Sequence, residues 1–249
     1  MSGHSKWATI KRAKGKADAA KGKLFNRLIR EITIAARMGG GDPESNPRLR
    51  SAISSARAAN MPNKNVETAV QKGTGQLEGV SYEEITFEGY GPGGVAVMVE
   101  SMTDNRNRTV AEVRHALSKS GGNLGQSNSV AWMFKAKGII RVSKDAMDED
   151  ALMELVLEAG AEDMSLDGDE YEISTTSEAF DDVRDALLNA NIEPVSAERT
   201  KVAENPVKVE GDTAAKVLRL IEMLDELDDT QNVYAAFEIS DDELEKLSG

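Results

Sequence analysis

The chain has 249 residues, of which 40% are hydrophobic, and its 30 Lys and Arg against 43 Asp and Glu give a formal net charge of −13. This length allows two or three globular domains, each with its own core. No run of about 18 apolar residues is present to span a membrane. The lack of cysteine excludes disulfides, thiolate catalysis and cysteine-ligated zinc, and it fits a cytoplasmic protein.

The charge is distributed unevenly along the chain. Residues 1–80 contain 15 Lys and Arg but 6 Asp and Glu, whereas residues 81–249 contain 15 and 37. Such an asymmetry indicates that the basic section binds a polyanion, which the acidic remainder repels. A solvated basic face without a partner is the alternative. The basic N-terminal segment has no apolar stretch typical of a secretory signal, and a mitochondrial transit peptide is the weaker reading of it.

Residues 1–79 are predicted to form a basic arm followed by a small helical domain. Residues 1–17 lack a regular apolar period, whereas apolar residues recur at helical spacing from residue 23 to residue 38. Capping residues and prolines favour two further helices, at about residues 47–60 and 66–72. The sequence therefore predicts three short amphipathic helices behind the arm.

The basic residues of the arm continue along one side of the first predicted helix. At about 100° per residue, Lys23, Arg27 and Arg30 fall opposite the apolar residues. Lysine and arginine neutralise phosphates with little regard to base sequence. Trp7 either stacks on an unpaired base or packs on the protein's own core. We predict that nucleic acid is bound by Lys6, Trp7, Lys11, Arg12, Lys14, Lys16, Lys21, Lys23, Arg27 and Arg30.

The remainder of the chain is predicted to form two α+β domains. Alternating residues flank a Gly-rich turn within residues 82–100 and indicate a hairpin, and a short strand is expected at residues 130–134. Residues 137–207 show the strand–helix–strand–strand–helix–strand order of a ferredoxin-like domain. A last helix, residues 213–227, and a last strand, residues 233–239, would complete the first sheet. We therefore expect a discontinuous middle domain, residues 80–136 and 208–249, that carries the ferredoxin-like domain as an insertion.

Groups suited to catalysis or metal binding are few. Residues 89–94 match G-x-G-x-x-G, but a strand rather than a helix follows, which favours a hairpin turn over cofactor binding. With His4 and His115 as the two histidines and no cysteine, a zinc site or a Ser/His/Asp triad has little to build on. The acidic runs at residues 225–229 and 241–243 indicate solvated surface. We expect no catalytic residue, metal or cofactor; a nucleotide-dependent enzyme using the loop from Gly89 to Gly94 is the weak alternative.

A second phosphate site is predicted where the hairpin meets the next helix, which runs from about residue 106 to residue 119. The free N–H groups of a helix N-terminus, together with Arg106 and Arg108, are suited to hold a phosphate. The alternative is that Asp104 or Asn105 caps the helix and nothing more. Both interpretations stay open at the level of the sequence.

Several motifs together resemble the YebC/PmpR family, and they cover residues 2 to about 138. They are SGHSKW at residues 2–7, GGGDP at 39–43 with NPRLR at 46–50, NMP at 60–62, EGYGPGG at 88–94 and TDNRNR at 103–108. One departure is the sequence SNSV at residues 127–130, where the family pattern leads us to expect glycine before Ser129. The departure affects that loop alone.

The resemblance implies a three-domain cytoplasmic protein, generally described as a DNA-binding transcriptional regulator. The family also includes the mitochondrial translational activator of cytochrome oxidase, and bacterial members have been linked to the ribosome and to relief of stalling. A Lys-rich arm fits DNA or ribosomal RNA equally well. We expect a non-enzymatic, monomeric regulator that binds nucleic acid and not membrane, with DNA-dependent transcription regulation first and translation regulation on the ribosome as the alternative. Its acidic domains are suited to bind a protein partner, and a pure protein adaptor is a further possibility.

Overall fold

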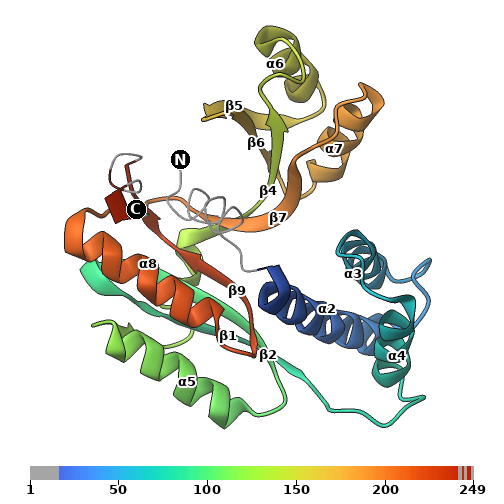
Figure 1. Ribbon diagram of the computed structural model, residues 1–249, viewed down its shortest axis with the longest axis vertical. Helices are drawn as coiled ribbons and strands as arrows, with labels where there is room; N and C mark the ends of the chain where they lie inside the picture. Colours follow the sequence, from blue (N-terminus) through green and yellow to red (C-terminus); the bar gives the residue numbers. More distant parts are fainter. Residues whose placement is uncertain (1–16, 241–242, 244–245, 248–249) are drawn as a thin grey trace. The chain divides into compact units, whose positions relative to one another are not determined.

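A computed structural model describes residues 17–240, 243 and 246–247. The chain forms two compact units: the larger comprises Met1–Ala131 and Pro206–Gly249, and the smaller comprises Trp132–Asn205 (Figure 1). The predicted α+β fold is confirmed, because helices come first and two α+β parts follow, the second inserted into the first. Among the described residues, no helix has the length and apolar character needed to cross a bilayer.

The helical part of the larger unit has three helices: α2 (Ala17–Gly39), α3 (Pro47–Ala58) and α4 (Asn63–Gly73). Helix α2 begins earlier than predicted, which fits the high helix propensity of Ala17, Ala19 and Ala20. The Asn46 side chain caps α3 by accepting from the Leu49 N–H, and its amide group donates to the carbonyls of Ala35 and Gly40. One buried cluster, which includes Ile32 and Leu49, joins the helices.

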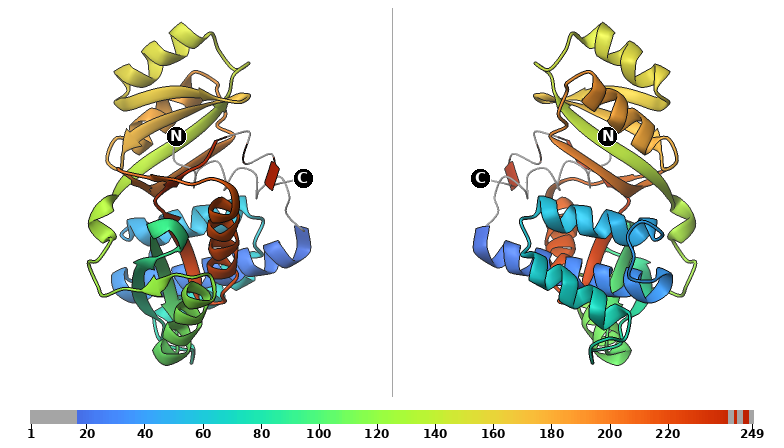
Figure 2. Two further views of the ribbon diagram at one scale, coloured as in Figure 1. Left: turned by 90° about the vertical axis from the view of Figure 1, so that its left-hand side faces the viewer. Right: turned by 90° about the vertical axis from the view of Figure 1, so that its right-hand side faces the viewer.

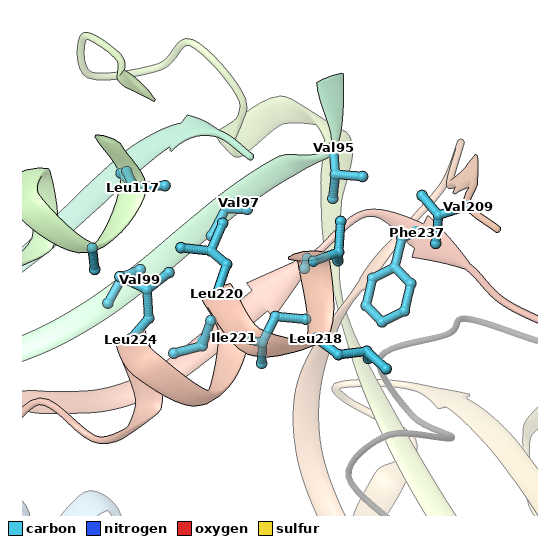
Figure 3. Packing of buried hydrophobic residues seen from close by; sticks show 14 of the residues in the cluster. Val95, Val97, Val99, Leu117, Val209, Leu218, Leu220, Ile221, Leu224 and Phe237 are labelled. Atoms are coloured by element: carbon cyan, nitrogen blue, oxygen red, sulfur yellow. The ribbon is translucent and has the colours of Figure 1, made fainter. Parts of the chain in front are cut away.

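The rest of the larger unit is a four-stranded antiparallel sheet with the order β3-β1-β2-β9. Its elements are β1 (Glu83–Tyr90), β2 (Ala96–Thr103), α5 (Arg106–Lys119), β3 (Asn123–Leu124), α8 (Gly211–Asp225) and β9 (Thr230–Ala235). Figure 3 shows Val97 and Val99 of β2 against Leu220 and Leu224 of α8 and Leu117 of α5. Both helices thus pack on one face of the sheet, and the hairpin of β1 and β2 is as predicted.

The predictions of two strands in this part of the chain were wrong in detail. A strand expected at residues 130–134 is instead a 3-10 turn, Ala131–Met133, because the buried Glu88 carboxylate accepts the N–H groups of Asn128, Val130 and Ala131 and holds them in a turn. The strand expected at residues 233–239 is divided at Ala236. Its N–H donates to Ala96, whereas its carbonyl accepts from Val207, so β9 gives way to the short parallel pair β8 (Val207–Lys208) and β10 (Phe237–Glu238).

Asn128 explains the departure from the family pattern in the same loop. Its φ is +66°, in the left-handed region that glycine adopts freely and that asparagine tolerates better than most residues. An asparagine before Ser129 is therefore compatible with a loop built for glycine.

The smaller unit has the ferredoxin-like order of elements that the sequence predicts. They are β4 (Phe134–Ser143), α6 (Glu149–Glu158), β5 (Ala161–Asp167), β6 (Glu170–Thr176), α7 (Phe180–Asn189) and β7 (Ser196–Ala203). The antiparallel sheet has the order β5-β6-β4-β7, with α6 and α7 on one face (Figure 2). Ile140, Ile173, Leu152 and Leu187 lie in the core between sheet and helices.

Candidate nucleic-acid interface

The residues predicted to bind nucleic acid fall into three groups. Lys6, Trp7, Lys11, Arg12, Lys14 and Lys16 lie outside the described residues. Lys21, Lys23, Arg27 and Arg30 lie on α2, and Arg106 and Arg108 lie in the first turn of α5. Lys21 is exposed, and its Nζ lies 5.7 Å from the centre of the Phe25 ring.

Lys23, Arg27 and Arg30 contact the residues from the end of α8 to the start of β9. The Arg27 Nη2 lies 2.9 Å from Asp225 Oδ1, and its Nε donates to the Thr230 carbonyl at 2.9 Å. Lys23 donates to the Asp225 carbonyl, and Arg30 donates to the carbonyl of Asp228. The basic side of α2 is therefore engaged within the larger unit.

Asp229 is the buried centre of this contact. Its Oδ2 accepts from Arg108 Nη2 at 2.6 Å, from Thr109 Oγ1 at 2.8 Å and from Thr103 Oγ1 at 2.9 Å, and its Oδ1 lies 3.1 Å from Arg30 Nη2. Burial alone would raise the pKa of Asp229, but the hydrogen bonds from Arg108 and the two threonines outweigh it. The pKa therefore lies below its usual value.

The prediction that residues 225–229 are solvated surface was wrong at its end, because Asp229 is fully buried. Charge pattern alone indicated an exposed acidic run. The physical reason for burial is that Arg30 and Arg108, from two different helices, supply compensating charge to this one carboxylate.

The predicted phosphate site at α5 has the features of a helix cap. The Asn105 side chain accepts from the Arg108 N–H, which is the capping arrangement, and the Arg108 guanidinium is held by Asp104 at 2.8 Å and by Asp229. Arg106 is exposed, with Glu83 at 3.6 Å. The geometry supports the capping interpretation, while phosphate binding by Arg106 and Arg108 stays a prediction.

Further exposed basic residues, on α3 and at the start of α4, were not predicted from the sequence. Arg50, Arg57 and Lys64 are exposed, and within residues 17–240 none of them has a carboxylate at ion-pair distance. Arg48 on the same helix contrasts with them. It contacts Glu31 at 2.7 Å and Glu84 at 2.6 Å, and these hydrogen bonds raise its pKa further above the usual value. The signal in the sequence was the spacing of Arg50 and Arg57, seven residues apart.

The Gly-rich loop, residues 89–94, is a tight hairpin connection with a 3-10 turn, Pro92–Gly94, between β1 and β2. A β-carbon at Gly91 would lie 2.8 Å from the Leu220 side chain of α8, so this glycine allows the loop to approach the core. In the described part of the chain, no three His, Asp or Glu side chains gather as metal ligands would.

The chain thus consists of a basic helical part followed by two α+β parts. Two family models match the chain. The TACO1/YebC protein N-terminal domain covers residues 5–76, and the TACO1/YebC second and third domain covers residues 82–237. The chain belongs to this family, which confirms the resemblance found in the sequence.

Relatives match along the whole chain. Proteins named "Probable transcriptional regulatory protein" from Acidobacterium capsulatum and Geobacter sulfurreducens are 58% and 56% identical over 249 and 247 residues, covering 100% and 99% of this chain and 100% of each relative. The crystal structure of a conserved hypothetical protein from Aquifex aeolicus is 48% identical with a TM-score of 0.80, and the match covers 91% of this chain and 93% of that one. The names place the chain among regulatory proteins rather than enzymes.

Proposed function

We propose that the protein is a cytoplasmic DNA-binding transcriptional regulator that holds the phosphate backbone through its basic N-terminal part. The observation that carries this proposal is the concentration of 15 Lys and Arg against 6 Asp and Glu in residues 1–80 of a protein with net charge −13. Cations gathered in this way bind a polyanion by releasing its counterions. The relatives' name supports transcription as the process.

The acidic remainder of the chain would restrict where nucleic acid binds on the protein. Residues 81–249 carry 37 acidic and 15 basic residues, so they repel a nucleic acid that the N-terminal part attracts. The protein would therefore meet DNA in one orientation. Contacts to the backbone carry no base sequence, so a preferred promoter would be selected by DNA shape or by a protein partner.

The arm is tested by replacing Lys6, Lys11, Arg12, Lys14 and Lys16 with glutamine in the full chain. Binding of a fluorescent DNA duplex is measured by anisotropy over a range of salt concentrations. If each residue contacts one phosphate, the slope of log K against log salt becomes shallower by about 4 to 5. A matched variant replaces five other basic residues of the larger unit, Arg114, Lys119, Lys208, Lys216 and Arg219, and is expected to bind like the wild type.

A wild type that does not bind the duplex, or an arm variant that binds as tightly as the matched variant, would overturn the proposal. The same titration with a competing ribosomal RNA fragment separates the alternative. RNA that displaces the duplex at physiological salt would make translation regulation the better description. Trp7→Ala, measured on single-stranded and duplex DNA, reports base stacking by a selective loss on the single strand.

A further inference from the structure

Helix α3 has one buried and one exposed side. Leu49, Ala52 and Ala56 lie in the core of the helical part. Arg50 and Arg57 lie on the exposed side, two turns apart, which places them about 10 Å from each other along the helix axis. This side is solvent-facing within the larger unit and carries two guanidinium groups in one row.

The two arginines differ from Arg27 and Arg30 of α2 in their surroundings. In the part of the chain that the structure describes, Arg50 donates to the backbone carbonyls of Pro43 and Glu44, at 3.1 and 3.3 Å, and neither Arg50 nor Arg57 forms an ion pair. Lys64, in the first turn of α4, is exposed in the same way.

The side chains between the arginines are small and polar. Ser54 lies between Arg50 and Arg57 on the same side of the helix, flanked by Ser51 and Ser55, and all three are exposed. Small side chains allow another backbone to approach the helix closely, and serine hydroxyls donate to phosphate oxygens. The guanidinium fork matches the geometry of a phosphate. The face has no large apolar residue, which is what a protein partner would need at the centre of an interface.

We propose that this α3 face, defined by Arg50, Ser54 and Arg57, is the surface of the helical part that contacts the phosphate backbone of duplex DNA. The basic side of α2 is instead a structural element that joins the helices to the sheet. The inference rests on the proposed function and adds to it a named surface, separate from the arm. Charge complementarity supports this surface, and so do the contacts that Lys23, Arg27 and Arg30 make within the larger unit.

The test uses the full chain with both arginines replaced, R50Q/R57Q, and a matched variant, R114Q/K119Q, in which two exposed basic residues of α5 are lost. Duplex binding is measured over a salt series. We expect the α3 variant to bind more weakly and its salt slope to become shallower by about 2, one contact for each arginine. The α5 variant is expected to keep the wild-type slope. Thermal unfolding checks that both variants are folded.

A second pair of variants tests the α3 face without replacing an arginine. S54E places a negative charge at the centre of the α3 face and is expected to weaken duplex binding, whereas S118E, at an exposed position of α5, is not. If wild type binds the duplex but both α3 variants bind as it does, the inference is overturned and the proposed function survives. If wild type itself does not bind, both fail. Weakened binding to a ribosomal RNA fragment with unchanged binding to the duplex would also overturn the inference.

Discussion

Arg27 and Arg30 of α2 and Arg50 and Arg57 of α3 belong to helices that share one core, yet the surroundings of the two pairs are opposite. Arg27 and Arg30 contact Asp225 and Asp229, more than 190 residues further along the chain. Arg50 and Arg57 have no carboxylate at ion-pair distance within the described residues. A basic helix face is therefore not by itself a nucleic-acid site. The acidic residues that the fold brings to it decide whether its charge is used inside or outside the molecule.

The difference has an energetic basis. A charge that is taken out of water must be compensated, and Asp229 is compensated by two arginines and two threonine hydroxyls. An exposed arginine needs no such compensation and keeps its full capacity to bind a phosphate. The compensated charge of Asp229 stabilises the larger unit, whereas the exposed arginines leave a surface available to bind phosphate.

The largest effect is expected from removing the centre of the α2 contact. Asp229→Ala removes the acceptor shared by Arg108, Thr103 and Thr109 and the ion-pair partner of Arg30, so the free energy of unfolding should fall by about 3 kcal/mol. Chemical denaturation of the full chain measures this free energy of unfolding. Asp228→Ala is the matched control, since Asp228 is exposed and contributes its carbonyl, not its side chain, to Arg30.

An Asp229→Ala variant as stable as Asp228→Ala would break the comparison, because α2 would then be no more engaged than α3. R50Q/R57Q is expected to leave the free energy of unfolding nearly unchanged, as surface substitutions do.

A smaller effect is expected from pH. The pKa values of Asp229 and Glu88 are both lowered in the folded protein: burial opposes ionisation, but arginine and hydroxyl donors at Asp229, and three backbone N–H groups at Glu88, favour it more. The unfolded chain then binds more protons, so stability rises with pH in this range. The contribution is complete above the unfolded pKa values, about 3.9 and 4.3, and is lost as pH falls through the lower folded values.

Denaturation between neutral pH and about pH 3, a range set by those carboxyl pKa values, checks this prediction. Asp229→Asn and Glu88→Gln should each be less stable than wild type at neutral pH and lose less stability in acid. A variant whose stability falls as steeply as that of wild type would contradict the assignment of that carboxylate. Asp228→Asn is the control and should keep the wild-type slope.

The sequence predicted the elements well because their signals are local. Asn46 before Pro47 marked the start of α3, and the turn at residues 89–94 between alternating segments marked the hairpin. Periodicity could not predict which part of the fold the basic side of α2 faces. It identified Lys23, Arg27 and Arg30 as opposite their own helical core, but their partners at residues 225–230 are set by tertiary structure.

In the candidate site, too, the sequence did not predict the partners that the tertiary structure brings together. Arg108 was chosen for its place near a helix N-terminus, and the carboxylate that holds it, Asp229, belonged to a run that charge alone indicated as solvated. Arg50 and Arg57 were not predicted to bind nucleic acid, because they lie outside the dense basic arm. They became notable when the burial of Leu49, Ala52 and Ala56 fixed which side of α3 faces solvent.

The most direct test of the two faces is arginine footprinting with phenylglyoxal, read by mass spectrometry, on the full chain with and without duplex DNA. We expect that Arg50 and Arg57 react in the free protein and are protected by DNA, while Arg27 and Arg30 react slowly in both states. The opposite result, Arg27 and Arg30 reactive when free and protected by DNA with no change at Arg50 and Arg57, would contradict this expectation and return the interface to α2.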